Sequence, residues 1–472
     1  MVPDRGTWQL TAGAAVIGLA FAAAAVTAAG PWDNGQRKAE REHAAALGRT
    51  GGADHQVTGR GREAAEAPGP APAPSAPGVL AAASAPKAPS AAPALAPALA
   101  DVLGPLLDDP GLGPLRTASV VDAATGEQLY GRATGTPMTP ASTVKIATAA
   151  AVLSATGPAH RIPTGVVATP DFRGITLVGG GDPTLDLPRM RTLAGRTAKS
   201  LRDRGVTTVR LTYDTTLYQG PVIHPIGAGN DNIAPVTALM VNAGRLDDST
   251  EGTAPRSADP AGDAARAFVG LLSEHGVNTA AGPVPGKAPA KGPALATTYS
   301  APVPALVERM LTSSDNDIAE ALARQTALAT RRPASFAGAQ AAVTDRLKRL
   351  KLPLAGARFA DGSGLNRADR VSAALLTTLL VRAADPAHPE LRPVLTGLPV
   401  AGFTGTLSGR AAAGSGGLVR AKTGTLRGVD TLAGTVLSAD GRLLAFAFLA
   451  GDTPSASAAR PALDRLAAAL LP

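Results

Sequence analysis

One predicted helix start constrains this chain more than any other stretch. Thr139 is suited to cap the helix and Pro140 to begin it, and a run of apolar residues follows. Ser142 then lies in the first turn, and Lys145 lies one turn further along the same face. We therefore expect the amine of Lys145 to contact the hydroxyl of Ser142.

These two side chains have the chemistry of a nucleophile and its base. A serine hydroxyl is a useful nucleophile near neutral pH only when a neighbouring base takes its proton. Burial against the apolar run 146–153 would lower the pKa of the Lys145 amine enough for that role. A two-residue pattern recurs often by chance, however, and S-x-x-K alone more often marks a capped surface helix.

Two further motifs follow in the chain. A serine-aspartate-asparagine motif begins at Ser314, and a lysine-threonine-glycine-threonine motif begins at Lys422. Alone, the first is a common loop composition and the second an ordinary strand end. S-x-x-K, S-D-N and K-T-G in this order are the signature of penicillin-binding proteins and class A β-lactamases. The three together therefore favour an acyl-transfer site over coincidence.

Acyl transfer gives the residues of the first two motifs distinct roles. Ser142 is the expected nucleophile and Lys145 the base that activates it. Ser314 can pass the proton towards the leaving nitrogen. Asn316 can hydrogen-bond the substrate amide or hold Lys145.

The third motif suits recognition of a carboxylate. On an edge strand, Lys422 would present a cation and Thr423 a hydroxyl. Gly424 would allow a close approach of backbone. The N–H of Thr425, with that of Ser142, could form an oxyanion hole.

Three other patterns suggest different chemistry but do not fit it. Ser363 lies in D-G-S-G, which lacks the G-x-S-x-G spacing of a nucleophile elbow. None of the six histidines is close in sequence to a motif, which argues against a Ser-His-Asp triad. The glycines 179–181 lack the spacing of a phosphate-binding loop and predict a turn.

Composition narrows the possible partners. The chain has no cysteine, so it has neither disulfides nor thiolate metal ligands. A net charge of +8 would suit an anionic partner such as nucleic acid or an acidic wall polymer. Aromatic residues are only 3%, and the basic residues are scattered, so stacking on bases has little support. We expect a soluble basic surface and no nucleic-acid partner.

The first hundred residues predict export followed by a spacer. Residues 10–29 carry no charge and follow a short cytoplasmic segment, 1–9, so they predict a transmembrane anchor or a cleaved signal peptide. A buried helix of a soluble domain is the less favoured alternative. Residues 30–100 are poor in large apolar side chains and carry nine prolines between Pro68 and Pro97, which predicts a disordered linker.

The remaining residues predict a mixed α/β fold in which the sheet is antiparallel, which is the α+β class. Strands at both ends, with helices between them, indicate an antiparallel sheet with helices packed on it. An Asp-Gly pair at 440–441 predicts a hairpin turn between strands 431–437 and 443–449. Ser142 and Ser314 are 172 positions apart, whereas Ser314 and Lys422 are only 108 apart. We therefore expect an inserted domain at 163–299, interrupting a domain built from 101–162 and 300–472.

Over residues 101–472 the chain resembles the serine D-alanyl-D-alanine carboxypeptidases of the class C low-molecular-weight penicillin-binding proteins, peptidase family S13. Beyond the three motifs, the resemblance rests on G-G-D-P-T-L at 180–185, A-P-V at 234–236, V-N at 241–242, D-G-S-G-L at 361–365, and G-T-L at 405–407 with Arg410. It implies a β-lactamase/transpeptidase-like domain with an insert, peptidoglycan stem peptides as substrate, and β-lactams as covalent inhibitors of Ser142. It implies no metal and no organic cofactor.

Three alternatives share the same motifs. A DD-endopeptidase that cuts peptidoglycan cross-links would use the same residues. A class A β-lactamase needs a glutamate downstream of S-D-N to activate water, and this chain has none between Glu320 and Glu390. A catalytically idle penicillin-sensing module tends to lose Ser142, Lys145 or Lys422, and all three are present.

Overall fold

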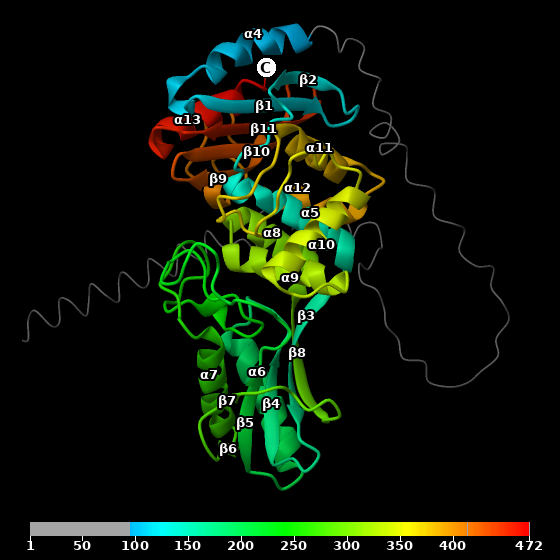
Figure 1. Ribbon diagram of the computed structural model, residues 1–472, viewed down its shortest axis with the longest axis vertical. Helices are drawn as coiled ribbons and strands as arrows, with labels where there is room; N and C mark the ends of the chain where they lie inside the picture. Colours follow the sequence, from blue (N-terminus) through cyan, green and yellow to red (C-terminus); the bar gives the residue numbers. More distant parts are fainter. Residues whose placement is uncertain (1–94, 413, 472) are drawn as a thin grey trace, which may run out of the picture. The chain divides into compact units, whose positions relative to one another are not determined.

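The computed structural model describes residues 95–412 and 414–471 (Figure 1). The expected cytoplasmic segment 1–9, the anchor or signal 10–29 and most of the linker lie outside this range. Helix α4 (Leu95–Leu107) begins inside the stretch predicted to be disordered, so that prediction is wrong for its last six residues. Among the described residues, no helix is both long and apolar enough to span a bilayer.

A five-stranded antiparallel sheet joins the two ends of the described chain. Its strands lie in the order β2-β1-β11-β10-β9, so an early hairpin pairs with a late three-stranded meander. The predicted fold class is confirmed, and so is the predicted hairpin between strands 431–437 and 443–449. The five strands are β1 (Leu115–Asp122), β2 (Gln128–Arg132), β9 (Val419–Leu426), β10 (Val429–Leu437) and β11 (Leu443–Gly451).

Alternating residues of the central strand β11 serve two separate cores. Phe446 and Phe448 stack on one face, where they pack with α4 and α13 (Ala456–Ala468). Ala445 and Ala447 face the other side, and their small size lets helices pack closely against the sheet. That second core contains α5 (Lys145–Thr156), α8 (Val303–Ser313), α9 (Asn316–Ala329), α10 (Phe336–Arg349), α11 (Ala373–Ala384) and α12 (Pro393–Thr396).

A second sheet is built from the residues between α5 and α8. Its main strands lie in the order β6-β5-β4-β3-β8, and α6 (Leu187–Arg202) and α7 (Pro260–Glu274) share a third core with it. The strands β3 and β8 pair with each other, so the chain begins and ends this region side by side. The strands are β3 (Arg161–Ala168), β4 (Gly174–Gly179), β5 (Thr208–Asp214), β6 (Asn278–Thr279), β7 (Val284–Pro285) and β8 (Ala294–Pro302).

The predicted insert limits, 163 and 299, fall inside β3 and β8. A long connection between β5 and α7, residues 215–259, contains only the short helical turn η4 (Asn242–Gly244). We call it the 215–259 connection. It contacts α9 through Asp317, which accepts a hydrogen bond from the N–H of Ala234 and pairs with Arg256 at 2.8 Å. The connection is thereby fastened to the helix that carries the second motif.

Candidate active site

Ser142 lies in a tight turn that precedes the helix proper. The turn η3 (Ala141–Val144) leads into α5, which begins at Lys145. The predicted cap by Thr139 is wrong, because Pro140 occupies the cap position and no side chain caps the turn. Ala141 is fully buried with a φ of 47°, a backbone conformation that costs a non-glycine residue energy and needs support from its surroundings.

That support comes from both sides of the turn. The hydroxyl of Thr431 donates to the carbonyl of Pro140 at 2.8 Å. A Cβ added to Gly424 would lie 2.7 Å from the same carbonyl oxygen. On the other side, Gly364 packs against the carbonyl of Ala141 with a φ of +83°. The close approach at Gly424 therefore holds the segment that carries Ser142.

Lys145 lies behind Ser142 and is fully buried. Its Nζ is 3.0 Å from Ser142 Oγ, 2.7 Å from Asn316 Oδ1 and 2.6 Å from the carbonyl oxygen of Ser363. Burial lowers the pKa of Lys145 to about 8, although nearby carboxylates, Asp361 first among them, oppose the shift. A neutral amine in this position can accept the proton of the Ser142 hydroxyl.

The second motif forms the corner between α8 and α9. Ser314 ends α8 with a φ of 57°, and the carboxylate of Asp315 caps α9 by accepting from the N–H of Ile318. This corner aims Asn316 at Lys145. The other end of the Asn316 amide donates to the carbonyl of Asn232 at 3.0 Å, in the 215–259 connection.

The third motif lies on β9, at the edge of the five-stranded sheet. Lys422 is fully buried, and its Nζ donates to the carbonyl of Thr423 at 2.8 Å. Burial, and then the charges of Lys145 and Arg410, hold the pKa of Lys422 well below its usual value. The Thr423 hydroxyl donates to Thr406 at 2.8 Å.

A cleft of about 280 Å³ opens onto these residues. Five of the predicted site residues line it: Ser142, Ser314, Asn316, Thr423 and Thr425. The remaining lining residues are Asn232, Leu365, Thr406, Arg410 and Arg460. Arg410 and Leu365 belong to stretches that carried the family resemblance, whereas no local pattern marked Asn232 or Arg460. Lys145 and Lys422 lie in the wall behind the cleft.

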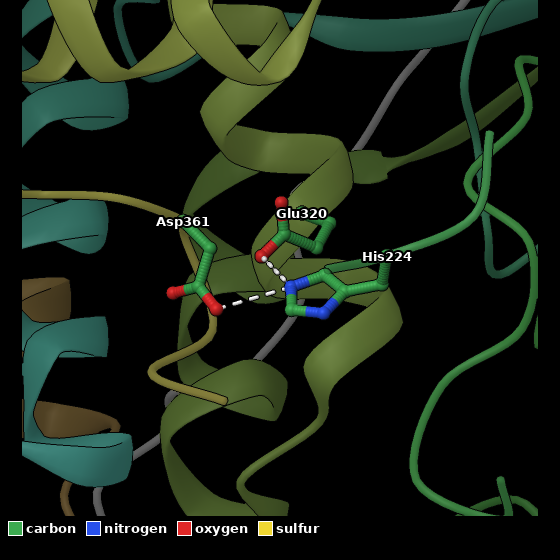
Figure 2. A group of neighbouring side chains, drawn as sticks. All are labelled: His224, Glu320 and Asp361. Carbon is green, nitrogen blue, oxygen red and sulfur yellow. Dashed lines mark hydrogen bonds and ion pairs between the residues drawn. The ribbon is translucent and has the colours of Figure 1, made fainter. Parts of the chain in front are cut away.

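One histidine that is distant in sequence from every motif lies beside the site. His224 comes from the 215–259 connection, and its Nε2 is 3.0 Å from Asp361 Oδ2 and 3.6 Å from Glu320 Oε1 (Figure 2). These three side chains have potential metal-ligand atoms within 4.8 Å of one another. Both carboxylates also accept backbone N–H groups of residues 362–364, so they already have partners within the protein.

The amino-acid sequence places this architecture in a known family. The model of the D-Ala-D-Ala carboxypeptidase 3 (S13) family matches residues 99–256 and 246–470. The chain belongs to this family. It is therefore a serine-type D-Ala-D-Ala carboxypeptidase, and the family named from the motifs is confirmed.

Similar proteins cover most of the chain. Carboxypeptidase Rv3627c of Mycobacterium tuberculosis is 38% identical over 86% of this chain and 89% of its own length. Carboxypeptidase DacB of Mycolicibacterium smegmatis is 36% identical over 88% of this chain and 92% of its own length. The crystal structure of penicillin binding protein 4 (dacB) from Haemophilus influenzae has the same fold, with a TM-score of 0.64 at 22% identity, covering 79% of this chain and 97% of that one. That protein has also been solved in complex with a β-lactam.

The pKa of Lys145 predicts how acylation depends on pH. Only the uncharged amine can take a proton, and its fraction rises as pH increases through a pKa of about 8. The rate of Ser142 acylation by a chromogenic β-lactam should therefore rise about fivefold from pH 7 to pH 8 and level off above about pH 9. Stopped-flow acylation rates across this range test it. A flat profile between pH 7 and pH 9 would contradict the role of Lys145 as base.

Proposed function

We propose that the enzyme removes the terminal D-alanine of peptidoglycan stem peptides through an acyl-enzyme on Ser142. The observation that carries this proposal is the 3.0 Å contact between Ser142 and a buried Lys145 at the wall of the cleft. A nucleophile, its base and hydrogen-bond donors converge there, as acyl transfer requires.

The reaction can be followed atom by atom on these residues. Lys145 Nζ accepts the hydroxyl proton while Ser142 Oγ bonds to the carbonyl carbon of the penultimate D-alanine. The backbone N–H groups of Ser142 and Thr425 are the proposed donors to the oxyanion. When the C–N bond breaks, the proton passes through Ser314 to the departing amine. Water then releases the shortened peptide and restores Ser142.

The carboxylate of the substrate is the proposed partner of the β9 side of the cleft. Thr423 and Thr425 line this side, together with Arg410 and Arg460. Arg410 is already paired with Asp464 at 2.8 Å. We assign direct contact with the carboxylate to the hydroxyls, because Lys422 is fully buried and its Nζ donates to the carbonyl of Thr423 behind them.

We also propose that the catalytic domain acts outside the cytoplasm. Residues 10–29 support either a membrane tether or a signal peptide, and the proline-rich stretch that follows suits a spacer. The substrate class is consistent with that location, since peptidoglycan lies outside the cell membrane.

The assignment of the nucleophile is tested by Ser142→Ala. This exchange should abolish covalent labelling by a fluorescent penicillin and loss of D-alanine from a monomeric pentapeptide muropeptide, followed by mass spectrometry. Thermal unfolding should remain close to wild type, because Ser142 lines the cleft and is not one of the buried core residues. Labelling of the folded variant would refute the assignment. Release of products from cross-linked muropeptides by wild type would favour the endopeptidase alternative.

Penicillin should be released slowly from the enzyme. Glu320, the glutamate that follows S-D-N most closely, is buried, with Oε1 bound to backbone N–H groups and Oε2 3.3 Å from Arg324. It is therefore not free to activate water. We expect near-stoichiometric inhibition, with the acyl group attached for many minutes, measured as the return of activity after removal of free penicillin. Rapid multiple turnover would indicate a β-lactamase.

Export is tested with fusions at the carboxyl terminus of the full chain. A phosphatase that folds only outside the cytoplasm should be active there, and a fluorescent protein that folds only inside should be dark. Deletion of residues 10–29 should reverse both results. The reversed pattern in the intact chain would refute export.

A further inference from the structure

His224 joins the 215–259 connection to the wall of the active site. Its side chain is only 1% exposed, and its ring makes an edge-to-face contact with Phe336 of α10, with centroids 5.4 Å apart. Its Nε2 lies between the carboxylates of Asp361 and Glu320, as Figure 2 shows. A buried imidazole shared by two buried carboxylates is a specific arrangement, and the reaction described above does not use it.

The two carboxylates hold the backbone of a short loop, residues 361–364. Glu320 Oε1 accepts from the N–H groups of Gly362 at 2.9 Å and Ser363 at 3.0 Å. Asp361 Oδ1 accepts from the N–H of Gly364 at 2.6 Å. These bonds fix the direction of the Ser363 carbonyl, which receives Lys145 Nζ at 2.6 Å. A continuous set of hydrogen bonds therefore runs from His224 to Lys145.

The charges of the cluster are close to balance. Burial opposes protonation of His224, but hydrogen bonds to Asp361 and Glu320 raise its pKa to about 9. Arg324 supplies a second cation, 3.3 Å from Glu320. Burial, and then the charge of Asp361, raise the pKa of Asp369 to about 10, so this third acid is neutral. Two anions therefore face two cations, which disfavours a metal ion in the cluster.

We propose that His224 is a positioning residue for acylation: its imidazolium holds Asp361 and Glu320, and through the 361–364 loop it sets the surroundings of Lys145. This inference rests on the proposed roles of Ser142 and Lys145. It makes the 215–259 connection, which lies far from every catalytic motif in sequence, a part of the catalytic apparatus.

The charge of His224 acts on Lys145 with a definite sign. Negative charges near Lys145 favour its protonated form, and the imidazolium offsets two of them. Loss of that charge should therefore make Lys145 harder to deprotonate and shift acylation to higher pH. The titratable and charged groups around Lys145 and His224 are Asp315, Glu320, Asp361, Arg324, Lys422 and the neutral Asp369.

The test compares three variants of the full chain. His224→Gln removes the charge but keeps a side-chain donor. Glu320→Gln removes a negative charge but keeps an acceptor for the loop. His275→Gln makes the same exchange as the first variant at the end of α7, away from this cluster. Each is assayed for the rate of acylation by a chromogenic β-lactam from pH 6 to pH 10, with thermal unfolding as the check of folding.

Opposite shifts are expected from the two charge changes. His224→Gln should move the midpoint of the pH profile up by at least about half a unit, and Glu320→Gln should move it down by a similar amount. His275→Gln should leave it unchanged. Unchanged midpoints in the folded cluster variants, or shifts of the same sign, would overturn the proposal even if the rates fall. Failure of wild type to be acylated would instead refute the proposed function.

A measurement on wild type covers the case in which the variants do not fold. Histidine ring nitrogens labelled with nitrogen-15 report protonation directly by NMR. We expect the imidazolium of His224 to persist at pH 8 and its signals to shift when penicillin acylates Ser142. If no histidine ring signal changes when Ser142 is acylated, the link between His224 and Lys145 is overturned.

Discussion

The structure of the site depends on the burial of a single amine. A lysine removed from water must find acceptors for its protons or lose its charge. Lys145 has hydrogen-bond acceptors, and burial also lowers its pKa. Its three acceptors come from the turn before α5, the start of α9 and the 361–364 loop. Three segments distant in sequence must therefore be correctly placed before one side chain can act as a base.

The need to place these segments correctly also explains why the backbone is crowded around Ser142. The strained Ala141, the close approach of Gly424 and the left-handed Gly364 all lie within one turn and its two supports. The conformation of Ala141 would be unfavourable in isolation, whereas the two glycines tolerate their close contacts. Together they fix the direction of the hydroxyl relative to Nζ. The helix α5 can be rigid here because its apolar face is buried among five other helices.

The connection between β5 and α7 contributes to this arrangement at three points. Asn232 receives the amide of Asn316, Asp317 binds both Ala234 and Arg256, and His224 contacts the acids behind the loop. All these contacts converge on α9 and on the loop beside it. The region of the second sheet therefore contributes to the active site, because the 215–259 connection completes the polar surroundings of the catalytic amine.

Local sequence patterns predicted the parts of the fold that depend on local chemistry. The Asp-Gly turn at 440–441 gives its hairpin, with Gly441 at a φ of 82°, and the motif residues fall at a helix start, a helix corner and an edge strand. The patterns missed what distant contacts decide. The hydroxyl of Thr139 accepts a hydrogen bond from Arg370 instead of capping the turn, α4 packs over Phe446 and Phe448, and His224 has no neighbouring motif. Such residues become recognisable only when the chain is folded.

The edge position of β9 has a consequence for the kind of segment that can pair with the sheet. The first part of this edge is covered by the segment 399–401, which pairs with Val419, Arg420 and Ala421. In the part of the chain that the structure describes, the later part of the edge pairs only with β10. An extended peptide can add there as a short extra strand, whereas the covered portion has no free backbone groups left for such pairing. Strand addition at this edge is thus confined to the part of β9 that carries the third motif.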